Sequence, residues 1–340
     1  MDSAFLIMTR NFARFLRARS RYNEIEISRR DRNIVSDNMR VLLIDVDSKI
    51  PNLALMKISA YHKSIGDEVG FNISQPDKIY ASIIFNKNHH AMDGLSMLYP
   101  DAEIDIGGGG YDLMKKLPDN IENMTPDYSL YGDDTIPIGF TTRGCIRKCP
   151  FCIVWKKEGK FHRLYDSPSE ALNHIIGDNT TGKVILLDNN ILADKEWFMA
   201  LSDEIIKRNL KVEFSQGLDI RLLDEEIAQK IAKMKSFSSW KFAFDSMNYK
   251  DAVLKGIKML NDAGFKVRSK ALFYVYCNDD ESVDDAVERC RILKSNNATA
   301  YSMINADVKQ TDRMKALKRW TRPWCFWSCD YDEFKNHKRG

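Results

Sequence analysis

The sequence contains no run of about 18 apolar residues, which is the length that a membrane-spanning helix needs. The first apolar patch, Ala4–Met8, is also too short for the hydrophobic region of a signal peptide. We therefore expect a chain with no membrane partner and a cytoplasmic location, where thiols stay reduced.

The chain also lacks the even number of cysteines that a complete disulfide framework requires, because it contains seven. In a reducing compartment, cysteines more often bind metals or take part in chemistry than form bridges. The spacing of the seven cysteines is therefore the first place to look for a functional site.

Net charge is nearly absent from most of the chain. The total is +3, and the first 40 residues hold nine arginines, no lysine and five acidic residues, which leaves −1 for the other 300. We interpret residues 1–40 as a basic leader outside the core fold, and an arm for nucleic acid or anionic lipid as the alternative. A neutral body argues against extended nucleic-acid binding, which needs a basic face.

Residues 41–112 have the pattern of a small Rossmann-like parallel sheet. Short apolar runs predict strands over 41–46, 69–73, 79–85 and 104–106. Pro51 is typical of a first helical turn, and Gly66 of a helix end. Gly107–Gly110 follows the last strand. Residues 113–135 contain two prolines and many turn formers, which indicates a linker.

A second series of alternating strands and helices spans residues 136–310. The predicted strands are 136–140, 183–187, 211–215, 240–244, 266–275 and 299–304, and the predicted helices are 168–177, 194–208, 224–234, 248–263 and 281–295. Six such steps are too few for an eight-stranded barrel. The prediction is an α/β chain with a Rossmann-like sheet followed by a partial (βα)6-type TIM barrel.

Three cysteines with the spacing C-x3-C-x2-C follow the first strand of this series: Cys145, Cys149 and Cys152. In a parallel barrel, active sites lie at this carboxyl end of the strands. Three thiolates bind three corners of a [4Fe–4S] cluster and leave the fourth iron open. The alternatives are a structural zinc site with His162 as fourth ligand and buried thiols with an accidental spacing.

The CxxxCxxC motif, with the aromatic Phe151 before its third cysteine, resembles the signature of the radical S-adenosyl-L-methionine (radical SAM) superfamily. The resemblance covers about residues 136–310. It implies an enzyme with a [4Fe–4S] cluster that cleaves S-adenosyl-L-methionine reductively to a 5′-deoxyadenosyl radical, which abstracts hydrogen from a substrate. It also implies an electron donor such as flavodoxin or ferredoxin. The substrate stays open among small molecules, peptides and nucleic acids.

Polar residues at later strand ends are candidate contacts for S-adenosyl-L-methionine. Asp188 and Asn189 follow the second strand, where many family members carry Gly-Gly-Glu instead. Gln216 and Arg221 follow the third strand, and Arg221 suits a carboxylate. Asp245 follows the fourth and suits a ribose hydroxyl. For each, a helix cap or an ion pair is the alternative.

Residues 41–112 also resemble the cobalamin-binding-type domain that precedes the barrel in one branch of the superfamily, on the helix at 51–64 and the glycine cluster. The Asp-x-His-x-x-Gly string that offers a histidine to cobalt is missing, and His89 and His90 stand in the wrong order. Cobalamin held by Gly107–Gly110, in a cobalamin-dependent methyltransferase, remains an alternative. A non-enzymatic zinc or iron–sulfur nucleic-acid-binding protein is the second alternative.

The tail, residues 311–340, contains three tryptophans together with Cys325 and Cys329. We expect its aromatic side chains to pack on the barrel and its cysteines to serve as small hydrophobic residues. The alternatives are a stacking surface for a nucleobase and a second cluster that also uses Cys277 and Cys290.

Overall fold

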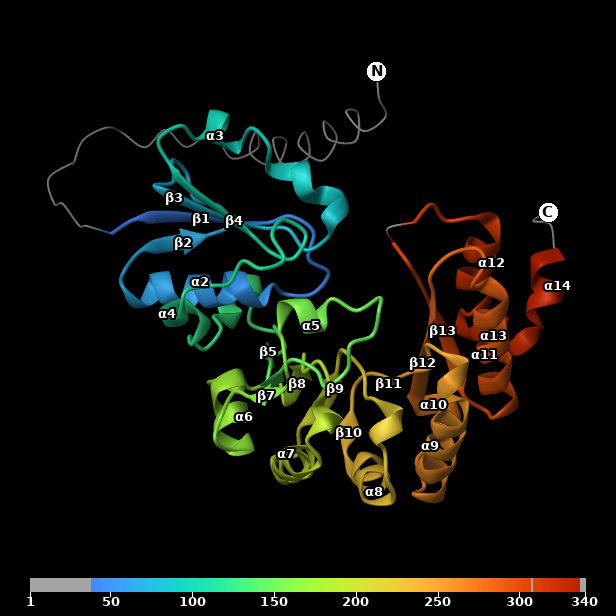
Figure 1. The fold of residues 1–340 in the computed structure, drawn as a ribbon. Coiled ribbons are helices and arrows are strands. Elements are labelled where there is room, and N and C mark those ends of the chain that lie inside the picture. The colour runs from blue at the N-terminus through green and yellow to red at the C-terminus, as the bar shows by residue number, and fades with distance from the viewer. Residues whose placement is uncertain (1–37, 307, 337–340) are drawn as a thin grey trace, which may run out of the picture. The chain divides into compact units, whose positions relative to one another are not determined.

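The computed structural model describes residues 38–306 and 308–336 and shows a mixed α/β protein with parallel sheets. The chain forms two compact units, one ending at Leu130 and the other beginning at Tyr131 (Figure 1). The predicted leader lies outside the described residues as far as position 37, whereas Arg40 belongs to the first strand. No helix in the described part of the chain is long and apolar enough to cross a membrane.

The first unit contains a parallel sheet with the strand order β2-β1-β3-β4. Its strands are β1 (Arg40–Asp45), β2 (Glu68–Gly70), β3 (Lys78–Ser82) and β4 (Glu103–Gly107). Alternate residues of β1 pack into separate clusters, Val41 and Leu43 in one and Leu42 in the other. Both faces of the sheet are therefore covered, which explains why these strands read as continuous apolar runs.

The helix α2 begins at Leu53 and ends at Ser64 (Leu53–Ser64), whereas the sequence pattern places Pro51 in its first turn. Asn52 caps it by accepting a hydrogen bond from Leu55 N at 3.2 Å, so Pro51 precedes the cap instead of opening the first turn. The helix ends where Gly66 takes a φ of +92°, as the glycine signal predicts. Between β3 and β4 the chain forms only short helices, η1 (Asn86–Met92) and α3 (Leu95–Leu98).

The predicted linker is more ordered than its composition indicates. It contains α4 (Asp119–Glu122) and η2 (Tyr128–Tyr131). Lys57 of α2 pairs with Glu122 at 3.0 Å, Ser59 donates to Asp127 at 2.6 Å, and Ile121 is buried. Two short helical turns therefore interrupt an otherwise irregular segment, and such single turns leave too short a sequence pattern to detect.

The second unit contains six parallel strands that follow one another in chain order. They are β5 (Ile138–Gly139), β8 (Lys183–Leu186), β9 (Lys211–Phe214), β11 (Trp240–Ala243), β12 (Ala271–Cys277) and β13 (Thr299–Ile304). β5, β8 and β9 form one sheet with the short β10 (Lys235–Ser236) at its edge, and β11, β12 and β13 form another. A parallel bridge between Leu218 and Phe242 connects the two sheets.

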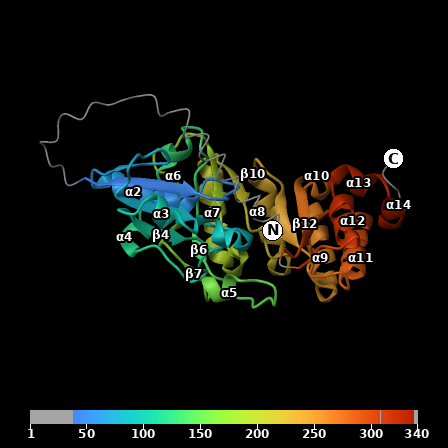
Figure 2. The ribbon, with the colours of Figure 1, turned by 90° about the horizontal axis from the view of Figure 1, so that it is seen from above.

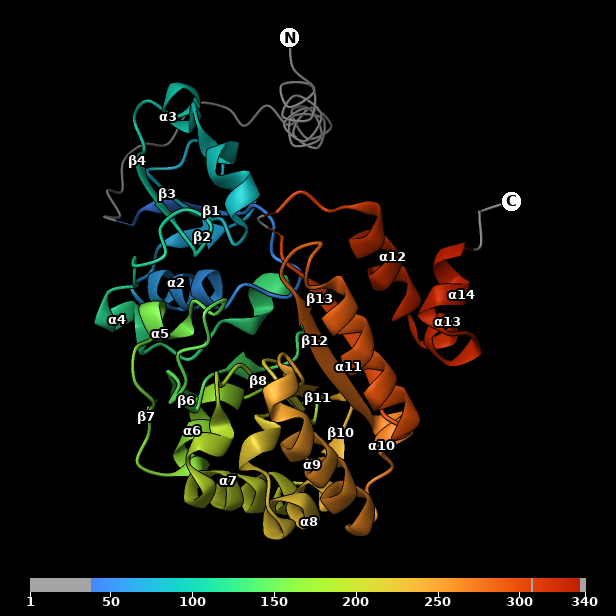
Figure 3. The same cartoon turned by 45° about the vertical axis from the view of Figure 1, so that its right-hand side comes forward.

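Helices alternate with these strands close to the predicted positions. They are α6 (Pro168–Ile176), α7 (Lys195–Lys207), α8 (Glu225–Lys233), α9 (Lys250–Asp262) and α11 (Val283–Ser295). The predicted strand at 266–275 begins too early, because Val267–Lys270 forms the helical turn α10. Figure 3 shows α11 lying along β12 and β13. On β12, Phe273 and Val275 are buried, whereas Tyr274 and Tyr276 on the opposite face are half-buried.

The described part of the tail forms three helices that lie close together, namely α12 (Asp312–Trp320), α13 (Pro323–Ser328) and α14 (Tyr331–Asn336) (Figure 2). α12 and α13 contact β13. Trp320 and Phe326 lie fully buried in the core of this unit. Thr321 Oγ1 accepts a hydrogen bond from Ser302 N of β13 at 3.1 Å. The tail therefore satisfies part of the open edge of the sheet, which otherwise presents unpaired backbone groups.

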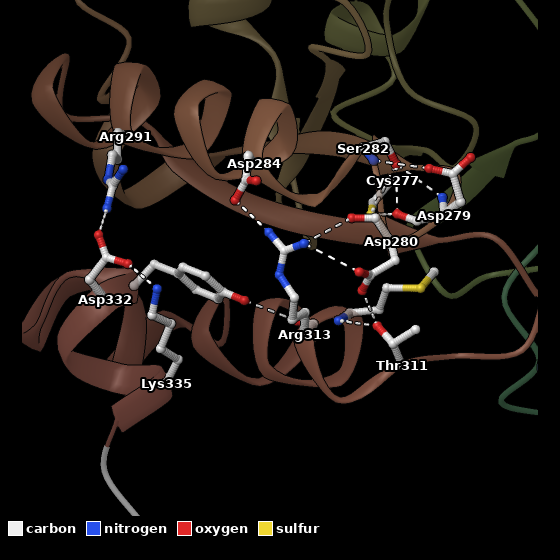
Figure 4. Close-up of polar contacts among 12 residues, drawn as sticks. Cys277, Asp279, Asp280, Ser282, Asp284, Arg291, Thr311, Arg313, Asp332 and Lys335 are labelled. Carbon is white, nitrogen blue, oxygen red and sulfur yellow. Dashed lines mark hydrogen bonds and ion pairs between the residues drawn. The ribbon is translucent and has the colours of Figure 1, made fainter.

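Ion pairs fasten the tail to the loop and helix that follow β12 (Figure 4). Arg313 contacts Asp280 at 3.2 Å and Asp284 at 2.6 Å, and Arg291 of α11 contacts Asp332 at 2.7 Å. All of these pairs are largely exposed, so the buried aromatic side chains carry more of the docking free energy than the charges do.

Trp320→Ala should lower the free energy of unfolding by about 3–5 kcal/mol, because the side chain is fully buried and its removal leaves a cavity. Urea unfolding measures the change. Trp324→Ala is the matched control, since Trp324 is 75% exposed and its truncation should change stability by no more than about 0.5 kcal/mol. Equal losses in both variants would contradict the packing described here.

Candidate functional site

All three motif cysteines lie in one loop that is closed at its base. The short strands β6 (Thr142–Arg143) and β7 (His162–Arg163) pair antiparallel and enclose the cysteines together with the short helix α5 (Val154–Lys157). Arg143 pairs with Glu158 at 3.0 Å, and Cys145 N donates to Gly159 O at 3.3 Å. The loop follows β5 at the carboxyl end of the parallel strands, as the sequence predicts.

Gly144, directly before the first cysteine, has to be glycine. Its φ is +78°, and a Cβ there would clash with the carbonyl oxygen of Lys160. Its N–H donates to Asn189 Oδ1 at 2.9 Å. Asn189, predicted to contact S-adenosyl-L-methionine, therefore holds the cysteine loop against the end of β8 in this structure.

The three thiols are partly exposed and influence one another. Burial raises the pKa of Cys149, the Arg221 guanidinium opposes this, and the neighbouring thiols of Cys152 and Cys145 add to the rise. A backbone hydrogen bond from Cys152 N to Cys149 O at 3.0 Å forms the turn between the second and third cysteines. Three partly exposed thiols thus lie in one loop, and a guanidinium opposes the effect of burial on the pKa of one of them.

Cys145 already receives hydrogen bonds at its sulfur. Arg147 N donates to Cys145 Sγ at 3.3 Å, and Asn190 Nδ2 donates to it at 3.4 Å. N–H donors directed at a thiolate are part of the environment that stabilises anionic sulfur ligands. This geometry suits a metal-bound thiolate.

Within the described ranges, no three His, Cys, Asp or Glu side chains converge closely enough to hold one metal ion. A zinc site needs four donors around a single ion. His162, the proposed fourth zinc ligand, is exposed at the base of the loop, with Nδ1 3.0 Å from Lys160 O. A cubane cluster needs a different arrangement of donors from a zinc ion, because each thiolate binds a different iron.

Asp188 is almost completely buried, at 3% exposed. Its Oδ1 accepts hydrogen bonds from the backbone N–H and the hydroxyl of both Thr141 and Thr142, at 2.6–3.2 Å. Burial raises the pKa of this carboxyl, and the hydrogen bonds from the two threonines oppose the rise. Asp188, predicted as a ligand contact, therefore fixes the start of the cysteine loop to the end of β8.

Arg221 lies near Cys149 but is paired within the protein. Its guanidinium contacts Asp219 at 2.6 Å and lies over the Tyr249 ring at 4.3 Å. Arg147 of the cysteine loop contacts the same carboxylate at 3.1 Å. Burial acts to raise the pKa of Asp219, but the hydrogen bonds and charges of Arg221 and Arg147 outweigh it and hold the pKa below its ordinary value. Two guanidinium groups on one carboxylate leave a net positive charge beside the thiols.

Asp245 and Phe151 both contact Tyr276 near the end of β12. Tyr276 N donates to Asp245 Oδ1 at 3.0 Å, and the Phe151 ring stacks on the Tyr276 ring at 4.3 Å. Burial raises the pKa of Asp245, and the hydrogen bond from Tyr276 and the charges of Arg289 and Arg221 oppose it. Gln216, the remaining candidate, is exposed.

Sequence reasoning did not assign roles to several residues that shape this site: Arg147, Asn190, Asp219, Tyr276 and Arg289. The pattern gives only a weak signal for them, since Asn190 is the third polar residue after β8 and Tyr276 lies on the half-buried face of β12. Arg289 is a fully buried cation on α11 that donates to the carbonyl oxygens of Phe244 and Tyr276 at 2.8 and 3.0 Å. It ties the ends of β11 and β12 together.

The glycine cluster of the first unit does not fit cobalamin. A Cβ on Gly108 or Gly110 would clash with the backbone of residues 83–85, so the chain itself fills the space that these glycines leave. His89 has Nδ1 3.1 Å from Gly110 O and stacks on Tyr111, and His90 pairs with Asp93 at 3.0 Å. These glycines serve close backbone packing, and we derive no chemistry through cobalamin.

The other cysteines are mostly buried, and all are free. Burial raises the pKa of Cys290 to about 12 and also raises that of Cys277. Cys325 is buried, and Cys329 Sγ donates to Cys325 O at 3.7 Å. These cysteines therefore lie among packed side chains, as the small hydrophobic residues of the sequence analysis would.

Comparison with known proteins adds no assignment: no model of a known protein family matches the chain, and no curated protein sequence matches it.

Asp188→Asn should keep the acceptor oxygen while removing a buried charge. Because the pKa of Asp188 is raised by burial, its contribution to stability is complete below its unfolded pKa near 4 and is lost as pH rises through the folded pKa. The free energy of unfolding of Asp188→Asn relative to wild type should therefore increase as pH rises above about 4. Urea unfolding at several pH values measures this.

Asp194→Asn provides a control of opposite sign. Hydrogen bonds from Arg163 lower the pKa of Asp194, which caps α7, so its contribution is present at neutral pH and is lost as pH falls through the folded pKa. Relative to wild type, Asp194→Asn should become less stable as pH rises from 3 to about 5. The same trend in both variants would contradict the environment assigned to Asp188.

Proposed function

We propose that this protein is a radical SAM enzyme that holds a [4Fe–4S] cluster on Cys145, Cys149 and Cys152. The observation that carries the proposal is the closed loop after β5, which presents three partly exposed thiols at the carboxyl end of the parallel strands. Backbone and amide N–H groups directed at Cys145 Sγ support it.

We interpret the second unit as the partial (βα)6-type barrel of that superfamily. Six parallel strands in chain order, with helices against one face, support this interpretation. The opposite face includes Tyr274 and Tyr276 of β12 and Tyr301 of β13, which are half-buried or exposed. A substrate that reaches the carboxyl end of the strands would meet this face.

When bound at the open iron of the cluster, S-adenosyl-L-methionine supplies a 5′-deoxyadenosyl radical for hydrogen abstraction. The protein's own residues would hold the cluster and shield the reacting groups. The net positive charge of Arg147, Arg221 and Asp219 beside the thiols favours an anionic centre. An electron donor of the flavodoxin or ferredoxin type would supply the electron.

We divide the candidate contacts into three groups. Asp188 and Asn189 are occupied in holding the loop, which makes them positioning residues. Phe151 and Gln216 retain exposed surface, and Asp245 is partly buried at a strand end, so we keep these three as contacts for S-adenosyl-L-methionine. The Arg221 guanidinium is paired with Asp219, and its positive charge stabilises the anionic centre proposed for the cysteine loop.

The test is anaerobic reconstitution with iron and sulfide, followed by reduction and addition of S-adenosyl-L-methionine. Wild-type protein should bind about four irons per chain and release 5′-deoxyadenosine, detected by mass spectrometry. Cys149→Ala should lose most of the iron and all of the product, because a missing thiolate leaves one cluster corner without its protein ligand.

Cys290→Ala is the matched control, since it removes a fully buried thiol outside the loop. It should retain the iron content and product of wild type. Cys325→Ala should do the same, because a second cluster is not expected. Wild-type protein that holds stoichiometric zinc and cleaves nothing would overturn the proposal.

A further inference from the structure

We propose that Asn190 sets the reduction potential of the cluster by donating a hydrogen bond to the Cys145 sulfur. The inference rests on the proposed function, because it requires a cluster on the cysteine loop. It concerns a positioning residue that the motif does not include and that comes from the turn after β8, not from the cysteine loop itself.

The contacts of Asn190 are well defined. Its side chain is buried, at 4% exposed, in the turn between β8 and η3 (Ile191–Ala193). Nδ2 lies 3.4 Å from Cys145 Sγ and 3.5 Å from Asp219 Oδ2. Oδ1 is buried and has no hydrogen-bond partner among the described residues.

The chemistry of the neighbours fixes which end of the amide faces the cysteine. A thiolate and a carboxylate are both acceptors, so the amide nitrogen must point toward them and the oxygen away. If the amide were flipped, Asn190 Oδ1 would face the Cys145 thiolate and the Asp219 carboxylate, and none of these three acceptors could donate a hydrogen bond. The orphaned Oδ1 is then the consequence of placing the donor at the sulfur, and losing a partner for a buried oxygen has a free-energy cost. Asn190 adopts this orientation although its Oδ1 has no hydrogen-bond partner among the described residues.

A hydrogen bond to a cysteine ligand stabilises the more negative, reduced state of an iron–sulfur cluster relative to the oxidised state. Asp219 keeps Asn190 in place and is itself balanced by Arg147 and Arg221, so its negative charge is offset. Asn190 therefore raises the reduction potential of the cluster, toward values at which a physiological electron donor can reduce it. The Arg147 N–H to the same sulfur comes from the loop backbone and persists when a side chain is changed.

Asn190→Leu tests the proposal, because leucine has nearly the same size and no donor. In reconstituted protein, a redox titration followed by electron paramagnetic resonance should give a more negative midpoint potential. We expect the ratio of reduced to oxidised cluster at a fixed potential to fall about tenfold, which corresponds to about 59 mV for one electron. Asn190→Ser, which keeps a smaller donor, should give a shift between those of wild type and Asn190→Leu.

Asn179→Leu controls for loss of a half-buried amide elsewhere. Asn179 donates to Thr135 O at 2.8 Å, on the side of β5 away from the cysteines, so this variant should keep the wild-type potential. An unchanged potential in Asn190→Leu with full iron content would overturn the inference. So would loss of iron from both Asn190 variants, which would make Asn190 a purely structural residue. Wild-type protein without a cluster would instead overturn the proposed function.

Discussion

The hydrogen bonds that Asp188 accepts from Thr141 and Thr142 are the constraint on which the candidate site depends. They join the end of β8 to the chain that leaves β5, just before the cysteine loop. Asn189 continues the connection through Gly144 N, and Asn190 through Cys145 Sγ. Three consecutive residues of one strand end therefore position the loop from its base to its first thiol.

A second set of contacts joins the loop to the later strands. Arg147 reaches Asp219 after β9, and Phe151 stacks on Tyr276 at the end of β12. Arg289 holds the ends of β11 and β12 together from α11. Because each contact comes from a different strand end, the shape of the site depends on the order of the whole parallel series. This is the physical reason that parallel α/β units place their chemistry at the carboxyl ends of the strands.

The first unit shows how one pattern can serve packing alone. Its parallel sheet matches the predicted strands, and its glycine cluster lies at the predicted strand end. Yet Gly108 and Gly110 are needed because the backbone of residues 83–85 passes close to them. A run of glycines identifies a position where a backbone approaches closely, and only the structure shows whether the approaching group is a ligand or the chain itself.

The sequence by itself determined the alternation of strands and helices and the position of the cysteine loop after the first strand of the second unit. These are local properties, since they depend on periodicity, turn chemistry and motif spacing. Only the tertiary structure decided that Asp188 and Asn189 point into the protein, that Arg221 is paired with Asp219 and that Asn190 faces a thiol. The partners of Asp188, Asn189 and Asn190 lie 45–47 residues away in the chain, and Asp219, which pairs with Arg221, also binds Arg147 from 72 residues away. A strand end fixes where a side chain starts, and its neighbours in space fix where it points.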